Sequence, residues 1–146
     1  MWVVSAVASA TRGVASRNSE TGHPRLVRAV AAIDAGQAVN PDGLTNQIEG
    51  AIMQSASWTL YEAVTFDDTR ITSIDWQTYP ILRFDSVPES VEVHIINRPG
   101  QPFLGSGETG QGPAAASIAN AIADATGKRL RDLPLTRKRI KNAIDA

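Results

Sequence analysis

A long helix predicted from Pro41 to Glu62 sets the strongest constraint on the fold of this chain. Asn40 can cap free backbone amides, Pro41 suits the first helical position, and Asp42 suits the positive end of the helix dipole. Apolar and small residues then recur at steps of three and four. They are Leu44, Ile48, Ala51, Ile52, Ser55 and Thr59. Because this apolar surface is wide, much of the helix circumference must be covered by the rest of the chain.

Short strand-like segments on both sides of this helix predict the layer that covers it. They are residues 2–10, 26–33, 63–66, 70–76 and 91–96. Further helices are predicted at residues 114–126 and in the basic segment 137–144. Trp58, Trp76 and Tyr79 are expected to be packing residues. Together these elements predict an α+β fold, in which helices pack on one face of a mostly antiparallel sheet.

Composition and charge exclude several classes of function. The 146 residues carry a net charge of -1, so nucleic-acid binding lacks its usual electrostatic support. The chain has no cysteine and only two histidines, which excludes thiolate and His-rich metal sites. No uncharged apolar stretch approaches the ~18–20 residues of a membrane span. The first cation, Arg12, follows the early apolar run, so no signal peptide is predicted, and the compartment stays open between cytoplasm and periplasm.

The glycine-rich segment of residues 99–113 contains the most informative side chain. Residues 105–110 match G-x-G-x-x-G, but the preceding strand ends near Asn97 and the next helix starts after Pro113, so a dinucleotide site is not predicted. Glu108 is a lone carboxylate among glycines before a helix. Such a loop can hold a general base in a closed pocket, where burial and nearby amides tune its pKa. The pattern alone favours a flexible surface loop with a solvated carboxylate, and it leaves the general-base interpretation open.

Three blocks of sequence carry a resemblance to a known family. They are AAIDAGQAVNPDGLTNQIEGAIMQS at residues 31–55, YPILRFDSVPESVEVHII at residues 79–96, and GSGETGQGPAAASIANAIADATGKRLRDLPLT at residues 105–136. In this order they resemble the C-terminal end of the molybdopterin-binding large subunit of the xanthine oxidase family of molybdenum hydroxylases. The branch they resemble most is the isoquinoline 1-oxidoreductase beta-subunit type. Residues 1–21 match poorly, so residues 22–146 are expected to form the C-terminal portion of a molybdopterin-binding domain.

The resemblance implies roles for four residues. Glu108 matches the catalytic base beside molybdenum, which accepts a proton while water-derived oxygen attacks an electron-poor substrate carbon. Gln47 matches a glutamine that lies against the pterin, and Gly107 and Thr109 are expected to shape the pocket around the base. The cofactor's dithiolene holds the metal in this family. No protein ligand to a metal is therefore expected in this chain.

The resemblance also implies partners. In the family, iron–sulfur clusters belong to a separate subunit or domain, and the upstream part of the large subunit supplies most cofactor contacts. The substrate would be a small molecule, either an aldehyde or an N-heterocycle. We therefore expect this chain alone to bind no molybdenum cofactor, to be inactive, and to expose an apolar patch that favours homo-oligomers. The alternative is a non-catalytic binding or assembly module, and the position of Glu108 relative to Gln47 distinguishes the two.

Overall fold

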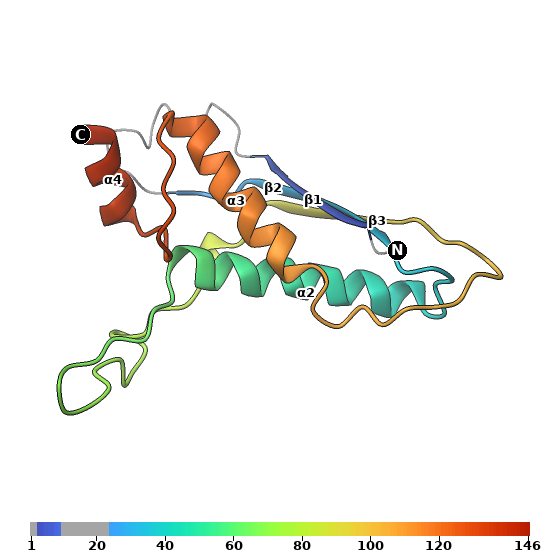
Figure 1. Cartoon of the computed structure of the whole chain (residues 1–146), viewed down its shortest axis with the longest axis horizontal. Helices are drawn as coiled ribbons and strands as arrows, with labels where there is room; N and C mark the ends of the chain where they lie inside the picture. The colour runs from blue at the N-terminus through green and yellow to red at the C-terminus, as the bar shows by residue number, and fades with distance from the viewer. Residues whose placement is uncertain (1–2, 10–23) are drawn as a thin grey trace.

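The computed structural model describes residues 3–9 and 24–146, which form a small sheet, two long helices and a short C-terminal helix (Figure 1). The strands are β1 (Val3–Ser9), β2 (Arg28–Asp34) and β3 (Ser90–Ile95). The helices are α2 (Pro41–Leu60), α3 (Gln111–Thr126) and α4 (Arg137–Asp145), with a 3-10 turn, η1, at Phe84–Ser86. The boundary expected at residue 21 lies outside the described residues. The fold therefore combines helices and strands, as predicted.

The sheet has the order β1-β2-β3 and contains one pairing of each kind. β1 runs antiparallel to β2, with Val3 opposite Asp34, whereas β3 runs parallel to β2, with Ile95 opposite Ile33. The prediction of a mostly antiparallel sheet is therefore not confirmed. The physical reason is the connection between the two strands. The chain leaves the end of β2, runs back along the sheet through α2 and then enters β3 in the same direction as β2, as crossover connections between parallel strands do.

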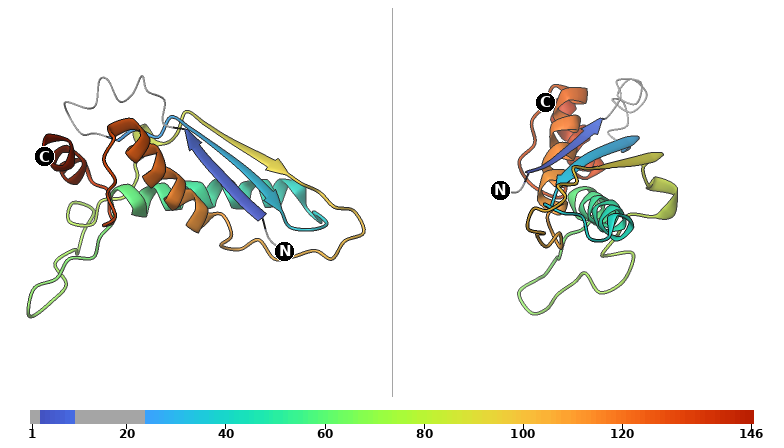
Figure 2. Two further views of the ribbon diagram at one scale, coloured as in Figure 1. Left: turned by 45° about the horizontal axis from the view of Figure 1, so that its top comes forward. Right: turned by 90° about the vertical axis from the view of Figure 1, so that its right-hand side faces the viewer.

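The core lies between this sheet and the two long helices, which pack on one side of it (Figure 2). α2 lies against β3, and α3 lies against β1 and α2. One cluster joins the sheet to both helices: Ala29, Ala31, Ile33, Leu44, Ile48, Ile52 and Ala114. The strand predicted at residues 91–96 forms as β3, and its side chains alternate: Val91, Val93 and Ile95 pack against this cluster while His94 is exposed. A second cluster fixes α3 and α4 to the end of α2, through Leu26, Ala56, Leu60, Ile118, Ile122, Leu135 and Ile140.

Local capping explains where the helices begin and end. The Asn40 side chain accepts a hydrogen bond from the Gly43 amide at 2.9 Å, and Pro41 occupies the first turn of α2. α3 ends at Gly127, whose φ of 71° lies in the left-handed region that glycine adopts readily. The Thr136 side chain caps α4 by accepting from the Arg139 amide at 3.4 Å. Among the described helices, none has the length and apolar character needed to cross a membrane.

A tight turn after β2 holds the start of the glycine-rich segment. Gly36 has a φ of 73°, and a Cβ added to it would lie only 2.0 Å from the Pro102 carbonyl oxygen. The Ala35 carbonyl accepts a hydrogen bond from the Leu104 amide at 2.9 Å. Only glycine permits both the backbone angle and this close approach. The turn therefore fixes the chain just before residues 105–110.

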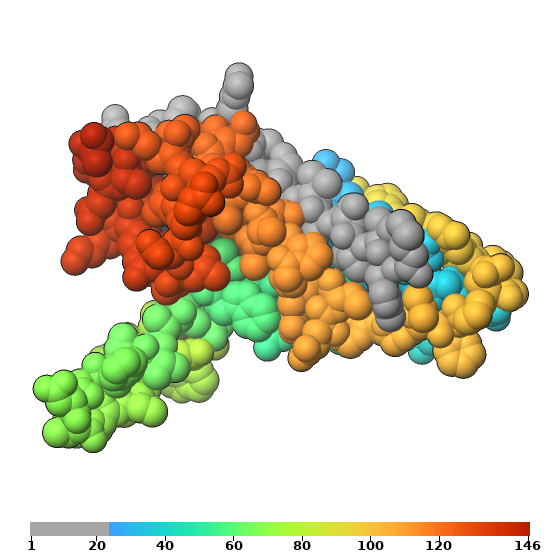
Figure 3. All heavy atoms as spheres, in the orientation of Figure 1, coloured from blue at the N-terminus to red at the C-terminus, as the bar shows by residue number. Residues whose placement is uncertain are grey.

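Residues 63–79 leave the body of the protein as a projecting segment, here called the arm (Figure 3). The hairpin strands predicted at residues 63–66 and 70–76 do not form, and the described pairing is a single bridge between Phe66 and Ile71. No residue of the arm is fully buried. Trp76 keeps 66% of its surface exposed, so the described residues do not confirm the prediction that it is a packing residue.

Candidate functional site

One face of α2 forms the support for the glycine-rich loop, residues 105–110. The Gln47 side-chain Nε2 donates a hydrogen bond to the Gly107 carbonyl oxygen at 2.5 Å. Two turns further along α2, the Gln54 Oε1 accepts a hydrogen bond from the Gln111 Nε2 at 2.7 Å. Residues seven apart share a helix face. The loop is therefore fastened to α2 at Gly107 and at Gln111, just after its last residue.

A buried hydroxyl strengthens the second of these attachments. Ser55 is fully buried and its Oγ donates to the Gln111 carbonyl oxygen at 2.5 Å. The Gln111 amide in turn donates to the Glu108 carbonyl oxygen at 3.3 Å. In the sequence, Ser55 reads as part of the apolar pattern of the helix, and no local signal indicates its contact with the loop. The contact links α2 to the backbone of Glu108 through one residue.

Close packing at Gly110 brings the loop onto the helix surface. Gly110 is buried, and a Cβ added to it would lie 2.9 Å from the Ala51 Cβ and 3.5 Å from the Ile48 Cδ1. By contrast, a Cβ added at Gly105 or Gly107 would meet no atom within 4 Å. The loop thus has one side pressed against α2 and an open side at its first two glycines.

Glu108 itself is exposed on this supported loop. Its carboxylate has no hydrogen-bond or ion-pair partner within the part of the chain that the structure describes. Thr109 is half-buried, and its hydroxyl lies 3.4 Å from the Ser106 carbonyl oxygen, to which it donates. The structure therefore brings Gln47 to the residue next to Glu108. It does not enclose the carboxylate in a pocket formed by this chain alone.

An ion pair with a buried aspartate organises the neighbouring turn, and no sequence pattern predicted it. The Asp34 Oδ2 lies 2.6 Å from the Arg98 Nη2, and the Asp34 Oδ1 accepts from the Gly36 amide at 3.1 Å. The Asp34 side chain is buried, whereas that of Arg98 is 58% exposed. Asp34 precedes the turn glycine, as acidic residues at turns often do. This pair fastens the segment after β3 to the end of β2, and we assign it a structural role.

The donor set around the loop fits an organic cofactor better than a bare metal ion. In residues 3–9 and 24–146, no group of three or more His, Asp or Glu side chains could hold a metal ion. The exposed groups at or beside the loop are the side-chain amide of Gln47, the backbone at Gly105 and Gly107, and the carboxylate of Glu108. Amides and open backbone can hydrogen-bond a polar cofactor that brings its own metal ligands.

Comparisons with known proteins agree on one kind of protein. The sequence model of the family described as "Molybdopterin cofactor-binding domain" matches residues 10–88. The B subunit of nicotinate dehydrogenase from Pseudomonas putida is 44% identical over 124 residues, which are 85% of this chain and 10% of that protein. The beta subunit of isoquinoline 1-oxidoreductase from Brevundimonas diminuta is 34% identical over 104 residues, which are 71% of this chain and 13% of that protein.

A solved structure extends the similarity to the fold. Quinoline 2-oxidoreductase from Pseudomonas putida 86 superposes with a TM-score of 0.75 at 28% sequence identity. The superposition covers 83% of this chain and 16% of the quinoline enzyme chain. This chain therefore spans between a tenth and a sixth of the length of the proteins it matches.

Proposed function

Because this chain belongs to the molybdopterin cofactor-binding domains of xanthine oxidase-type molybdenum hydroxylases, we propose that it carries the general base of such a site. The base is Glu108, and Gln47, Gly107 and Thr109 contribute to the cofactor side of the same loop. The observation that best supports the assignment is the hydrogen bond from Gln47 to the Gly107 carbonyl, which joins two residues 60 positions apart. That contact ties the proposed cofactor-binding helix to the residue preceding the base.

Each residue of this chain has a distinct task in the proposal. When bound, the molybdopterin cofactor supplies the two-electron redox chemistry of a hydroxylation whose oxygen comes from water. Glu108 accepts the proton released as that oxygen forms its bond to an electron-poor substrate carbon. Gln47 holds the loop through its Nε2 and has its Oε1 available to a cofactor donor. The open backbone at Gly105 and Gly107 admits the cofactor close to the main chain.

The substrate and the partners follow from the same family membership. The substrate is either an N-heterocycle or an aldehyde, because the similar proteins include enzymes named for both. The partners are an iron–sulfur subunit and the remaining part of a large subunit. The isolated chain is expected to bind no cofactor and to be inactive. The comparisons do not favour the alternative of a non-catalytic assembly module.

The assembled enzyme tests the role of Glu108. The chain is co-expressed with the upstream portion of a large subunit and with the iron–sulfur subunit, and hydroxylation of an N-heterocycle is measured. Glu108→Gln is expected to lower turnover by ~100-fold or more, since a positioned base contributes roughly 10²–10⁴-fold. Molybdenum content should stay unchanged in this variant. Asp124→Asn, at an exposed position of α3, is the matched control, because it makes the same carboxylate-to-amide change away from the loop. Unchanged turnover in Glu108→Gln would refute the assignment.

A further inference from the structure

Ser55 is a polar side chain on the buried face of α2, and it is 0% exposed. A hydroxyl has one proton to donate, and a serine inside a helix often donates it to a carbonyl of the preceding turn. Ser55 instead donates to the Gln111 carbonyl oxygen, 56 residues along the chain. Both the burial and the hydrogen bond arise within this chain. They therefore do not depend on the polypeptide that completes the proposed cofactor site.

The residue that Ser55 holds is itself bonded to the proposed base. The Gln111 amide donates to the Glu108 carbonyl oxygen at 3.3 Å, which closes a turn over residues 108–111. Gln111 is also the first residue of α3, so its position fixes the end of this turn. Its side chain bonds to Gln54, but that bond is exposed and competes with water. The buried bond from Ser55 is therefore the attachment that water cannot replace.

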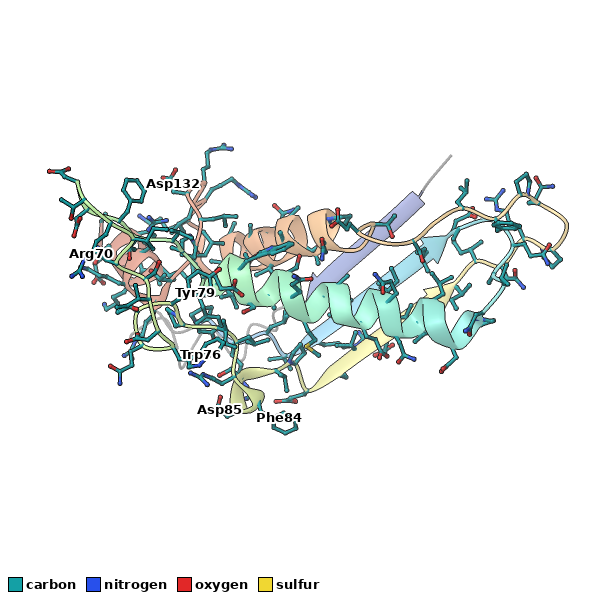
Figure 4. All side chains as sticks on the ribbon, turned by 90° about the horizontal axis from the view of Figure 1, so that it is seen from below. Arg70, Trp76, Tyr79, Phe84, Asp85 and Asp132 are labelled. Carbon is teal, nitrogen blue, oxygen red and sulfur yellow. The ribbon has the colours of Figure 1, made fainter. Side chains whose placement is uncertain are left out.

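Three side chains of α2, spaced four residues apart, meet the loop and the start of α3 in chain order. The pairs are Gln47 with Gly107, Ala51 with Gly110, and Ser55 with Gln111. Figure 4 shows α3 beside α2, with the chain before α3 running on along the same helix. Residues at steps of four lie one above another on a helix. The chain is therefore laid along one stripe of α2 on both sides of Glu108.

We propose that Ser55 is a positioning residue for the base, because its hydroxyl holds Gln111 and thereby fixes the backbone of Glu108 through the turn. This inference rests on the proposed function of Glu108 and adds a residue that acts through the loop backbone alone. A reacting group must be held within about 0.5 Å of its productive geometry, and a misplacement of ~1 Å can lower the rate ~100-fold. Removing one of several attachments should cost less, about tenfold.

Amide hydrogen exchange in the full 146-residue chain tests the contact without requiring activity. Ser55→Ala should speed exchange of the Gln111 amide about two- to tenfold, as expected when one hydrogen bond is lost. The Leu82 amide should be unaffected in this variant. An unchanged rate at Gln111, or the same acceleration at both amides, would overturn the positioning role whether or not Glu108 is the base.

Ser57→Ala is the matched control, because it makes the same substitution at a second buried serine of α2. The Ser57 Oγ accepts a hydrogen bond from the Leu82 amide at 2.9 Å. Figure 4 shows Phe84, two residues after Leu82, on the opposite side of α2 from α3. The control should therefore give the reverse result, with faster exchange at Leu82 and an unchanged rate at Gln111.

Turnover in the assembled enzyme tests whether the contact serves the base. Expressed per molybdenum, kcat of Ser55→Ala should fall about tenfold with an unchanged KM, whereas Ser57→Ala should match the parent enzyme. In a Glu108→Gln background, Ser55→Ala should cause no further loss, because a positioning residue has no effect once its base is removed. A further loss of about tenfold in that background would show a structural role and overturn the proposal.

The same assay separates failure of this inference from failure of the proposed function. Unchanged turnover in Glu108→Gln would refute the assignment of the base itself. If turnover falls in Glu108→Gln but stays at the parent level in Ser55→Ala, the base assignment stands and the positioning role of Ser55 is wrong.

Discussion

The contact between Gly110 and α2 gives the sharpest test of how the glycine-rich loop is held. Gly110 has a φ of -80° and a ψ of -21°, so alanine fits its backbone without strain. The added Cβ would lie 2.9 Å from the Ala51 Cβ, closer than such atoms approach. Both atoms are attached directly to backbone, so neither can rotate away. Overpacking costs about 1–3 kcal/mol, and losing glycine at the helix N-cap adds several tenths. We expect Gly110→Ala to lower the free energy of unfolding by about 2 kcal/mol, measured by urea denaturation.

A double-mutant cycle separates the steric contact from the other effects of this substitution. Ala51→Gly alone should destabilise the chain by about 1–2 kcal/mol, through helix propensity and the lost methyl group. When Ala51→Gly is combined with Gly110→Ala, the clash is removed. The double variant should therefore be more stable, by about 1–2 kcal/mol, than the sum of the two single-variant losses predicts. Gly107→Ala is the matched control in the same loop and should stay within about 1 kcal/mol of the parent protein, because its Cβ meets open space. A coupling energy near zero would refute the proposed close approach.

Three further measurements address the turn after β2, the start of α2 and the base of the arm. Gly36→Ala should destabilise the chain by at least ~2 kcal/mol more than Gly100→Ala in urea unfolding, because both have positive φ but only Gly36 also meets a carbonyl oxygen, at 2.0 Å. Equal losses of stability in the two variants would show that the backbone relieves the clash at Gly36. Asn40→Ala should reduce stability by about 1 kcal/mol through loss of the cap, and no change would contradict the capping role. The hydrogen bond to Glu62 raises the pKa of the Tyr79 phenol, so its stabilising effect is present below the ordinary phenol pKa and lost as the pH rises through the raised value. Glu62→Gln should lower the pKa of Tyr79 toward its ordinary value in an ultraviolet titration, and an unchanged titration would show that the bond does not form in solution.

The parts of the fold that local chemistry determines could be predicted from the sequence. The start of α2 depends on Asn40 and the two residues after it, and the end of α3 depends on Gly127. The buried face of β3 follows from simple alternation at Val91 and Val93. Each of these features is decided by residues a few positions apart, so a single sequence contains the information. α3 begins at Gln111, three residues before the predicted start, because the first turn of a helix tolerates Pro113.

The features that could not be predicted from the sequence depend on contacts between distant segments. The direction of β3 depends on the path of the chain after α2, which no local pattern records. Residues 63–76 have β-branched residues and a turn, but no neighbouring strand pairs with them in the described chain, and only the Phe66–Ile71 bridge forms. The candidate site shows the same division. Glu108 and Gln47 could be named from the family resemblance, whereas the attachment through Ser55 and Gln111 required the three-dimensional structure.

The arrangement around Glu108 agrees with the proposed role, in which this chain positions the base and other polypeptide completes its site. The anchors lie on either side, at Gly107 and Gln111, so the backbone of the loop is fixed while the carboxylate stays exposed. A general base, however, is usually tuned toward the working pH by burial and by neighbouring groups. In this structure α2 provides the position, and nothing in the described chain provides the burial. In the proposed function the covering surface comes from the polypeptide that completes the cofactor site, so we expect activity only on assembly, with the loop already in place beforehand.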